Sequence, residues 1–210
     1  TVSYDGDGNF TAATATAGFT IATVDPSLGV VVGNITYGNN ATIVVNVNPG
    51  ATGKVNITVN GKSELVDIVN GRATLIVSGL AAGNYTVSVK YDGDGKFNGD
   101  NVSAEFTVSA IDPGMNVVVS NITYGNNVTV TVTVNDKATG KVNITVNGVD
   151  HEVDIVDGRA VYTVVNPTAG SYTVTVSYDG DGNFTAATAS TEFNVAKINP
   201  DMTVTVSNIT

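Results

Sequence analysis

The sequence predicts an all-β protein made of tandem two-sheet β-sandwiches, each with about seven antiparallel strands. Three observations support this: an 87-residue repeat, strict alternation of apolar and polar residues, and turn signals every 8 to 12 residues. The motif NITYGNN begins at Asn34 and Asn121, and its first three letters return at Asn208, so that the interval is 87 residues both times. A fixed period with short alternating segments and no helical pattern is typical of an array of small β-sandwich domains.

The repeat sets the expected domain organisation. Residues 34–120 and 121–207 share 52 of 87 positions without insertion or deletion. Proline follows Asp25, Asp112 and Asn199 at the same interval, just after the last expected strand, and restrains the backbone of each junction. We therefore expect semi-rigid joints in a rod of successive beads. The expected parts are the C-terminal part of one repeat (1–25), two complete repeats (26–112 and 113–199) and the first strand of a further repeat (200–210), within a longer protein.

Alternation identifies the strands and their core faces. Ile43, Val45 and Val47 point to one side of a strand, with Thr42 and Asn46 on the other. The same pattern assigns further residues to the core: Val55, Ile57, Val59, Val66, Ile68, Ala73, Leu75, Val77, Tyr85, Val87, Val89, Tyr91, Phe106 and Val108. In the next copy Val130, Val132 and Val134 repeat the first set. Each repeat is thus expected to bury one face of every strand.

Dipeptide turns separate these strands. Asn60-Gly61 and Asn70-Gly71, with their equivalents at 147–148 and 157–158, suit two-residue type I′ turns. Both turns are expected to join antiparallel neighbours. Tyr85 and Tyr172 stand where a tyrosine corner would begin the sixth strand.

Composition excludes several classes of function. The chain has no cysteine, so it has neither disulfides nor thiolate metal sites. Its net charge of −10 argues against nucleic acid as a partner, because phosphates would be repelled. No apolar run approaches the roughly 20 residues that cross a bilayer. A membrane or wall anchor is expected outside this sequence.

The sequence resembles a known family in TGKVNITVNG, AGNYTVSVKYDGDG and AGSYTVTVSYDGDGNF. These segments are similar to the tandem Ig-like repeats of bacterial and archaeal adhesin-like surface proteins. In that family a strand ending in Tyr leads into a Gly-Asp turn and then an aromatic residue, here Tyr91, Gly93-Asp94 and Phe97. The resemblance implies an extracellular stalk or adhesive array. It is specific for the fold and carries little information on a ligand.

The YDGDG turn is a candidate calcium site. It places carboxylates at alternate positions, as early ligands of a calcium loop are spaced, but it lacks the Gly and acidic residue that complete an EF-hand. The alternative is a tight turn that uses Asp and Gly for their backbone conformations. In an Ig-like sandwich this turn lies at the pole where the chain enters, so a linker carboxylate would approach it. The candidate ligands are Asp5, Asp7, Asp25, Asp92, Asp94, Asp112, Asp179 and Asp181.

Asn-x-Ser/Thr triplets indicate N-glycosylation of a surface protein. The alternative is that a β protein rich in Asn and Thr produces such triplets by chance. The candidate acceptors are Asn9, Asn34, Asn40, Asn56, Asn84, Asn101, Asn121, Asn127, Asn143, Asn183 and Asn208.

Catalytic residues are not indicated. His151 is the sole histidine, its counterpart is Glu64, and we expect it to be a solvated strand residue. Glu152 and Asp154 alternate onto the same expected exposed face. Without cysteine or a second histidine, the usual nucleophiles, bases and zinc sites are missing.

The expected function is a structural and adhesive stalk on a prokaryotic cell surface, carrying a distal binding element outside this sequence. The expected partners are neighbouring repeats of the same chain. In one alternative the repeats assemble into a fibre or lattice through strand edges; in another they bind a glycan or host protein through polar strand faces.

Overall fold

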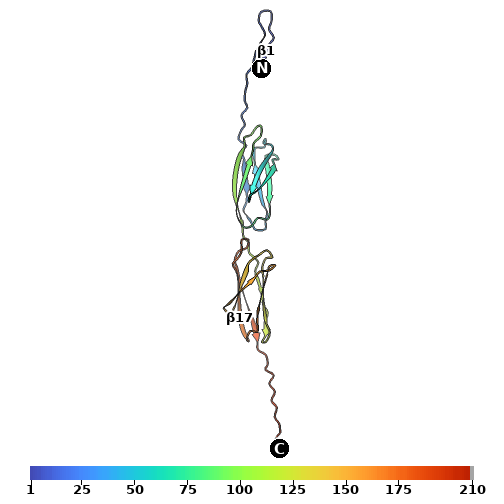
Figure 1. Ribbon diagram of the computed structural model, residues 1–210, viewed down its shortest axis with the longest axis vertical. Coiled ribbons are helices and arrows are strands. Elements are labelled where there is room, and N and C mark those ends of the chain that lie inside the picture. The colour runs from blue at the N-terminus through green and yellow to red at the C-terminus, as the bar shows by residue number, and fades with distance from the viewer. Residues whose placement is uncertain (209–210) are drawn as a thin grey trace. The chain divides into compact units, whose positions relative to one another are not determined.

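The computed structural model describes residues 1–208 and contains strands and turns but no helix in that part. It follows that no helix there is long and apolar enough to cross a membrane. The chain divides into two compact units (Figure 1). Unit 1 comprises residues 1–32, 42–76 and 86–105, and unit 2 comprises, within the described residues, 33–41, 77–85 and 106–208.

Each complete repeat contributes eight strands. Those of the first are β3 (Gly29–Val32), β4 (Ile35–Thr36), β5 (Ala41–Asn46), β6 (Lys54–Val59), β7 (Lys62–Asp67), β8 (Arg72–Val77), β9 (Gly83–Tyr91) and β10 (Asp100–Ser109). Those of the second are β11 (Asn116–Val118), β12 (Ile122–Thr123), β13 (Val128–Thr133), β14 (Lys141–Val146), β15 (Val149–Asp154), β16 (Arg159–Val164), β17 (Gly170–Tyr178) and β18 (Ala187–Ala196).

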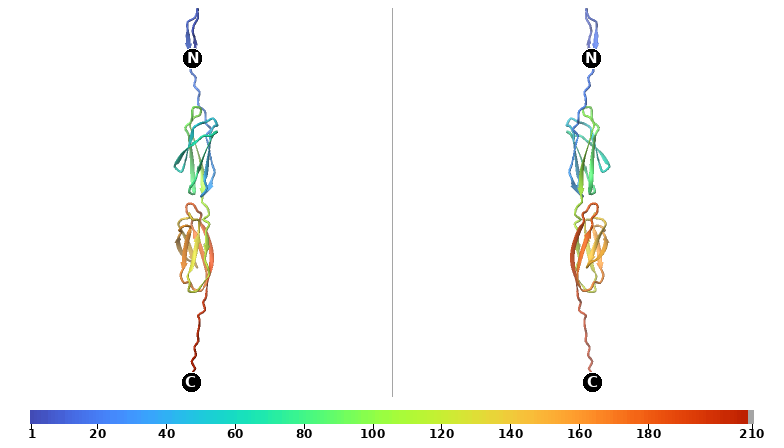
Figure 2. Two further views of the ribbon diagram at one scale, coloured as in Figure 1. Left: turned by 90° about the vertical axis from the view of Figure 1, so that its right-hand side faces the viewer. Right: turned by 90° about the vertical axis from the view of Figure 1, so that its left-hand side faces the viewer.

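The strands form two sheets in each repeat, visible as two layers in Figure 2. The sheet orders are β3-β5-β8 with β4-β10-β9-β6-β7, and β11-β13-β16 with β12-β18-β17-β14-β15. The predicted all-β sandwich is confirmed. The expectation of seven strands becomes eight because the first strand divides: β3 and β11 pair in the small sheet, whereas β4 and β12 cross to the large one.

The crossing strand pairs in parallel with the last strand of its repeat. Ile35 lies opposite Val108, and Ile122 lies opposite Val195. An asparagine side chain supports each crossing: Asn34 Oδ1 accepts the backbone N–H of Thr107 at 2.8 Å. At the next crossing Asn121 Oδ1 accepts the N–H of Asn194 at 2.7 Å. These bonds satisfy backbone donors where the strand leaves one sheet for the other.

The cores are apolar, as the alternation predicts. In the first repeat Ile43, Val45, Val55 and Ile57 are fully buried. The core of the second contains Val128, Val130, Val132, Ala138, Val142, Ile144, Val146, Ala160, Val174, Val176, Tyr178, Phe184, Phe193 and Val195. No polar or charged residue within 1–208 is classed as buried. Packing of apolar side chains therefore supplies the main stabilisation of both repeats, without disulfides.

The hairpin turns have the predicted backbone. At Asn60-Gly61 φ is +50° and +72°, and at Asp157-Gly158 it is +49° and +69°, as a type I′ turn requires. The first of these turns joins β6 and β7, which pair antiparallel. The expectation that the second turn also joins sheet neighbours is wrong: β7 and β8 lie at the edges of different sheets. The chain bends there, and only Val69 and Arg72 form an isolated bridge.

The ends of the chain differ in structure. Residues 1–25 contain an antiparallel pair, β1 (Val2–Tyr4) and β2 (Ala13–Ala15). Residues 200–208 carry no strand, in contrast to the first strand expected there. A short strand gains its hydrogen bonds only from a neighbour, and none pairs with these residues. Residues 209–210, in the same prediction, lie outside the described part.

Candidate functional site

The acidic turn between β17 and β18 is organised around one carboxylate. Asp181 Oδ1 accepts the backbone N–H groups of Asn183 and Phe184 at 2.7 and 2.9 Å. Its Oδ2 accepts the N–H of Thr139 at 3.0 Å and the Thr139 hydroxyl at 2.9 Å. One side chain thus shapes its own turn and fastens it to the loop before β14.

The first repeat contains the same arrangement. Asp94 Oδ1 accepts the N–H groups of Lys96 and Phe97, and its Oδ2 accepts the N–H and hydroxyl of Thr52, over 2.7 to 2.9 Å. The tyrosine that ends the preceding strand reaches the same threonine: Tyr91 donates its hydroxyl to the Thr52 carbonyl at 3.1 Å. Tyr178 does the same to Thr139 at 3.1 Å. The Tyr, Asp and Thr therefore form a repeated clamp between the turn and the neighbouring loop.

Hydrogen bonding governs the ionisation of these groups. The bonds from the N–H groups of Lys96 and Phe97 hold the pKa of Asp94 far below its ordinary value. Desolvation acts in the opposite direction on Asp181, but four hydrogen bonds together lower its pKa to about 2. Burial, followed by the nearby Asp181 charge, raises the pKa of Tyr178 to about 12. At neutral pH the clamp therefore combines an ionised carboxylate with a neutral phenol.

The chain enters each repeat beside this turn, as the topology predicts. Ile111 forms a parallel bridge with Phe184: its N–H donates to the Asn183 carbonyl at 3.0 Å, and its carbonyl accepts from Thr185 at 2.8 Å. Val24 forms the corresponding bridge with Phe97. The entering chain is therefore hydrogen-bonded to the turn that precedes the last strand.

The candidate calcium ligands do not converge. Within residues 1–208, no group of three or more carboxylate or histidine side chains is placed to hold a metal ion. Asp25 caps its own turn by accepting the N–H of Ser27 at 2.6 Å, and Asp112 accepts that of Gly114 at 2.6 Å. Asp25 lines a small hollow with Asp100, Asn98 and Gly99. The carboxylates have structural roles in turns, and calcium binding stays a prediction.

The remaining candidate ligands are also turn residues or lie beside a turn. Asp7 Oδ1 accepts the N–H groups of Asn9 and Phe10, and the bond from Asn9 is the main cause of its lowered pKa. Asp92 forms an ion pair with Lys90 at 2.8 Å. Asp5 and Asp179 are exposed.

The sole histidine does not match the expectation of a solvated strand residue. His151 is partly buried, and its ring stacks on Tyr162 with centroids 4.1 Å apart and an interplanar angle of 20°. Its Nε2 lies 3.0 Å from the Tyr162 hydroxyl. The reason is that β15 and β16 are edge strands of different sheets that come together at the open side of the sandwich. In the first repeat Glu64 and Leu75 occupy these positions. The joint replacement of both residues between the two copies is therefore the one sign of this contact in the sequence.

The tyrosine corners are present as predicted. Tyr85 donates its hydroxyl to the Ala81 carbonyl at 2.9 Å, and Tyr172 donates to that of Thr168 at 3.0 Å. The Tyr172 ring also stacks on Phe193, with centroids 4.8 Å apart. Each corner fixes the loop before β9 or β17.

The sequon asparagines differ in exposure. Asn9, Asn34, Asn40, Asn84, Asn101, Asn121, Asn127 and Asn208 are exposed, whereas Asn56, Asn143 and Asn183 are partly buried. Asn143 Oδ1 is fully covered and has no hydrogen-bond partner within the described residues. The Asn208 triplet extends into residues outside the described part. The sequon asparagines, which look equivalent in the sequence, therefore fall into an exposed group and a partly buried group in the structure.

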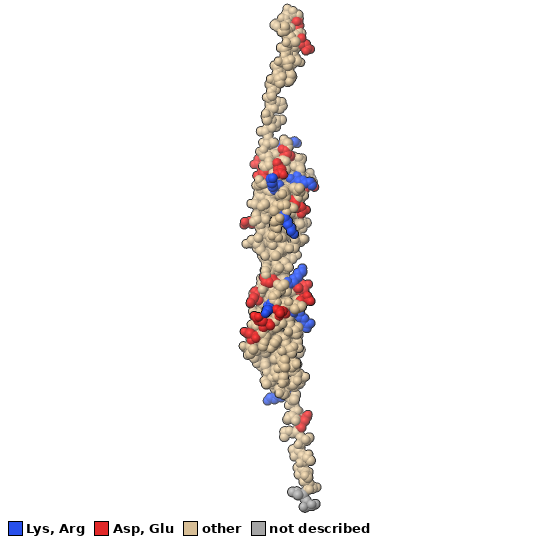
Figure 3. Space-filling view, in the orientation of Figure 1, with Lys and Arg blue, Asp and Glu red and all other residues tan. Residues whose placement is uncertain are grey.

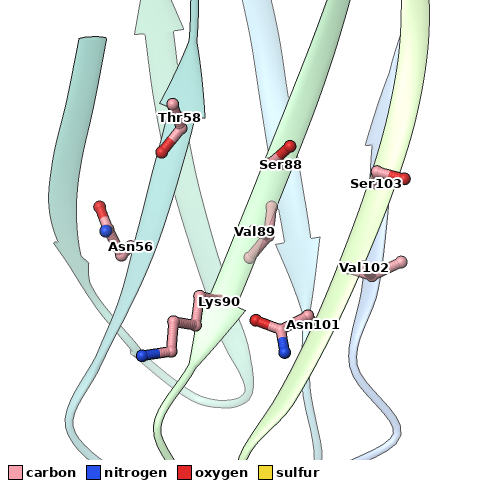
Figure 4. A pocket seen from close by; sticks show the side chains of 8 residues that line it. All are labelled: Asn56, Thr58, Ser88, Val89, Lys90, Asn101, Val102 and Ser103. Atoms are coloured by element: carbon pink, nitrogen blue, oxygen red, sulfur yellow. The ribbon is translucent and has the colours of Figure 1, made fainter. Parts of the chain in front are cut away.

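A polar hollow on the large sheet of the first repeat is the other candidate site. It has a volume of about 360 Å³ and is shown in Figure 4. Its lining comes from β6, β9 and β10 and comprises Asn56, Thr58, Ser88, Val89, Lys90, Asn101, Val102 and Ser103. Apart from Lys90 its polar groups are amides and hydroxyls, which suit an uncharged polar ligand.

Surface charge is distributed without a basic patch on the face seen in Figure 3, where Lys and Arg are interspersed with Asp and Glu. Exposed ion pairs join Lys54 to Asp67 and Lys141 to Glu152, both at 3.2 Å. Such exposed pairs contribute little to stability.

Comparison with solved structures returns tandem β-sandwiches at low identity. The fibronectin(III)-like modules of Clostridium thermocellum CbhA match with 14% identity, covering 85% of this chain and 100% of that one, at a TM-score of 0.36. Titin Ig tandem domains A164–A165 match with 12% identity, 85% and 100% coverage and a TM-score of 0.33. The adhesin InvE of Yersinia pseudotuberculosis matches with 16% identity, 81% and 61% coverage and a TM-score of 0.40. No curated protein sequence matches the chain.

The family comparison covers most of the chain. The model of the bacterial Ig-like domain (group 3) matches residues 28–109 and again residues 115–196. Each match spans the strands of one sandwich and ends at its last strand, and the predicted junctions at 25–26 and 112–113 lie just outside the matches. The chain therefore belongs to the bacterial Ig-like domain family, group 3, and contains two tandem copies of that domain.

Proposed function

We propose that this chain is a section of a structural, adhesive stalk on a prokaryotic cell surface, which carries a distal binding element beyond these residues. The observation that carries the proposal is the parallel pairing of the first and last strands of each domain, Ile35 with Val108 and Ile122 with Val195. When a domain is pulled by its two ends, these neighbouring parallel strands are drawn in opposite directions. Their hydrogen bonds then bear the load together in shear.

Further contacts reinforce the same strand pair. Tyr124 N–H donates to the Ala196 carbonyl at 2.9 Å, which extends the parallel pairing beyond β12. Asn121 adds its side-chain bond to the Asn194 N–H at the other end. A stalk needs such resistance at the points where the chain enters and leaves each domain, and it needs no catalytic group.

Pulling a single chain by its two ends tests the mechanical role. Between Ile122 and Ala196 lie 75 residues, counted inclusively, whose extended length is about 250 to 270 Å. Their folded ends are strand neighbours, so we expect two cooperative steps of about 250 Å each, one per domain. Smooth extension at low force, without such steps, would refute the mechanical role.

A matched pair of variants tests the contribution of the Asn121 bond to the parallel pairing of β12 with β18. Asn121→Ala removes the bond to Asn194 and should lower the unfolding force of the second domain. Asn126→Ala is the control, because the Asn126 side chain donates to Thr123 within its own turn, at 3.0 and 3.2 Å, and to no other residue in the described part of the chain. Equal unfolding forces of the second domain in the two variants would contradict this contribution. Antibody labelling of intact source cells tests the surface location separately.

Assembly into a fibre through strand edges is the less supported alternative. The edge strands of the large sheets, β7 and β15, carry charged residues, which oppose edge-to-edge pairing of strands. They are Lys62, Glu64, Asp67, Asp150, Glu152 and Asp154. Sedimentation at increasing protein concentration tests this alternative: a mass that stays at one chain excludes the fibre.

A further inference from the structure

The polar hollow of the first repeat is lined by two complete glycosylation sequons from distant parts of the sequence. Asn56-Ile57-Thr58 belongs to β6 and Asn101-Val102-Ser103 belongs to β10. In an extended strand, residues i and i+2 point to the same face. Both the asparagine and the hydroxyl residue of each sequon therefore face this hollow, with β9 between them.

The strand register fixes the neighbours of these groups. Asn56 lies opposite Lys90, and Thr58 lies opposite Ser88 on β9. Figure 4 shows the Asn101 side chain extending from β10 toward the strand that carries Lys90. Lys90 is paired with Asp92 at 2.8 Å, so its charge is compensated at the end of the hollow.

Exposure separates the two asparagines. Asn101 is exposed near the start of β10, whereas Asn56 is partly buried on an inner strand flanked by β7 and β9. The Thr58 hydroxyl is also engaged, at 2.8 Å from the Ser63 hydroxyl. A transferring enzyme must reach both the asparagine amide and the hydroxyl of a sequon. Only the Asn101 sequon meets that requirement.

We propose that Asn101 carries an N-linked glycan whose first sugar lies in the hollow, and that Asn56 stays unmodified. In the transfer step, Asn101 Nδ2 forms a bond to the anomeric carbon of a glycosyl phosphate donor. The bond from that carbon to the phosphate oxygen breaks, the phosphate leaves with the electron pair, and the amide loses one proton.

The hollow suits the first sugar in size and chemistry. Its volume of about 360 Å³ lies at the lower end of the roughly 300 to 1,000 Å³ of small-molecule sites. The hydroxyls of Ser88 and Ser103 and the amide of Asn56 are groups that hydrogen-bond sugar hydroxyls. A glycan in this place would cover Lys90.

The second repeat provides an internal comparison. Thr188 occupies the position of Asn101, and Ser177 that of Lys90, while Asn143 still corresponds to Asn56. The second repeat thus keeps the inner sequon and lacks the accessible one. We expect no glycan on its corresponding face.

Glycopeptide mapping of the protein from its source cells tests the proposal. Cleavage after Lys and Glu releases 97–105, 55–62 and 142–152, each with one sequon, at Asn101, Asn56 and Asn143 respectively. We expect a glycan mass on 97–105 only. An unmodified 97–105, or a glycan on either other peptide, would overturn the proposal.

Two variants made in the source cells test whether the sequon is used and whether the first sugar lies in the hollow. Ser103→Ala should abolish the modification of 97–105, whereas Ser78→Ala, at an exposed residue outside the hollow, should leave it unchanged. The rate of amine labelling at Lys90 tests the position of the sugar, because a sugar in the hollow would cover this side chain. Lys90 should react several-fold more slowly in the native protein than in Ser103→Ala, with Lys62 on β7 as the control. Equal Lys90 rates would overturn the placement of the sugar.

The proposal rests on the surface location given by the proposed function, and the two can fail separately. Surface labelling with an unmodified 97–105 refutes the glycan alone. Absence of the protein from the surface of intact cells refutes the proposed function instead.

Discussion

Replacing Asp181 with Asn tests the clamp that fastens the acidic turn to the second domain. The amide keeps one oxygen for the N–H groups of Asn183 and Phe184, but an NH₂ group then faces the Thr139 N–H. A buried donor left unpaired costs about 1–3 kcal/mol, and the cost here should lie at the lower end of that range because Thr139 is exposed and water can reach its N–H. The lowered pKa gives a similar figure: a shift from 3.8 to about 2 corresponds to about 2 kcal/mol at most, because solvent partly screens this carboxylate.

Thermal and chemical unfolding of the whole chain at pH 7 measures the effect, and hydrogen exchange in β17 assigns it to the second domain. For a domain of this size each 1 kcal/mol lowers Tm by about 4–8 °C. Asp179→Asn is the control, since this neighbouring carboxylate is exposed. If both variants unfold alike, or if Asp181→Asn unfolds as the unaltered chain does, the clamp does not stabilise the domain.

The same carboxylate predicts an acid dependence. Because the folded-state pKa of Asp181 is lowered, its contribution is complete above the unfolded-state pKa of 3.8 and is lost as pH falls through about 2. The free energy of unfolding of the second domain should therefore fall across that window. The fall should be smaller in Asp181→Asn, and an identical fall would contradict the assignment.

Three further predictions concern other parts of the chain. Tyr172→Phe removes the hydroxyl bond to Thr168 and should lower the free energy of unfolding by about 1 kcal/mol, measured by denaturant titration. Gly158→Ala should destabilise by more than 1 kcal/mol, because φ is +69° and a Cβ would lie 2.8 Å from the Val134 carbonyl oxygen. Gly182→Ala, with open space around it, is the matched control, and equal losses would refute the steric reason. Calorimetric titration of the whole chain tests the predicted calcium site: saturable binding up to millimolar calcium would support the site, and the absence of any heat of binding would refute it.

Part of the candidate site was predictable from the sequence and part was not. The YDGDG turn and its position beside the entering chain followed from the motif and the sandwich topology. The partner of its second aspartate did not, because Thr52 and Thr139 lie 42 residues before Asp94 and Asp181. No local pattern links a loop threonine to a distant turn. For the same reason, the sequence did not reveal the hydrogen bonds that Asp94 and Asp181 accept from these threonines.

The sequence by itself determined the period, the strands, the core faces, the type I′ turns and the tyrosine corners. Each of these is a local consequence of residue spacing, backbone preference or alternation. Only the tertiary structure decided which strands lie at the sheet edges, which strands pair, and which residues from different strands share one surface. It divided the first strand between two sheets, stacked His151 on Tyr162, and brought the sequons of Asn56 and Asn101 to one hollow. The physical reason is that pairing order and sheet edges depend on contacts between residues far apart in the chain, which alternation within one strand does not specify.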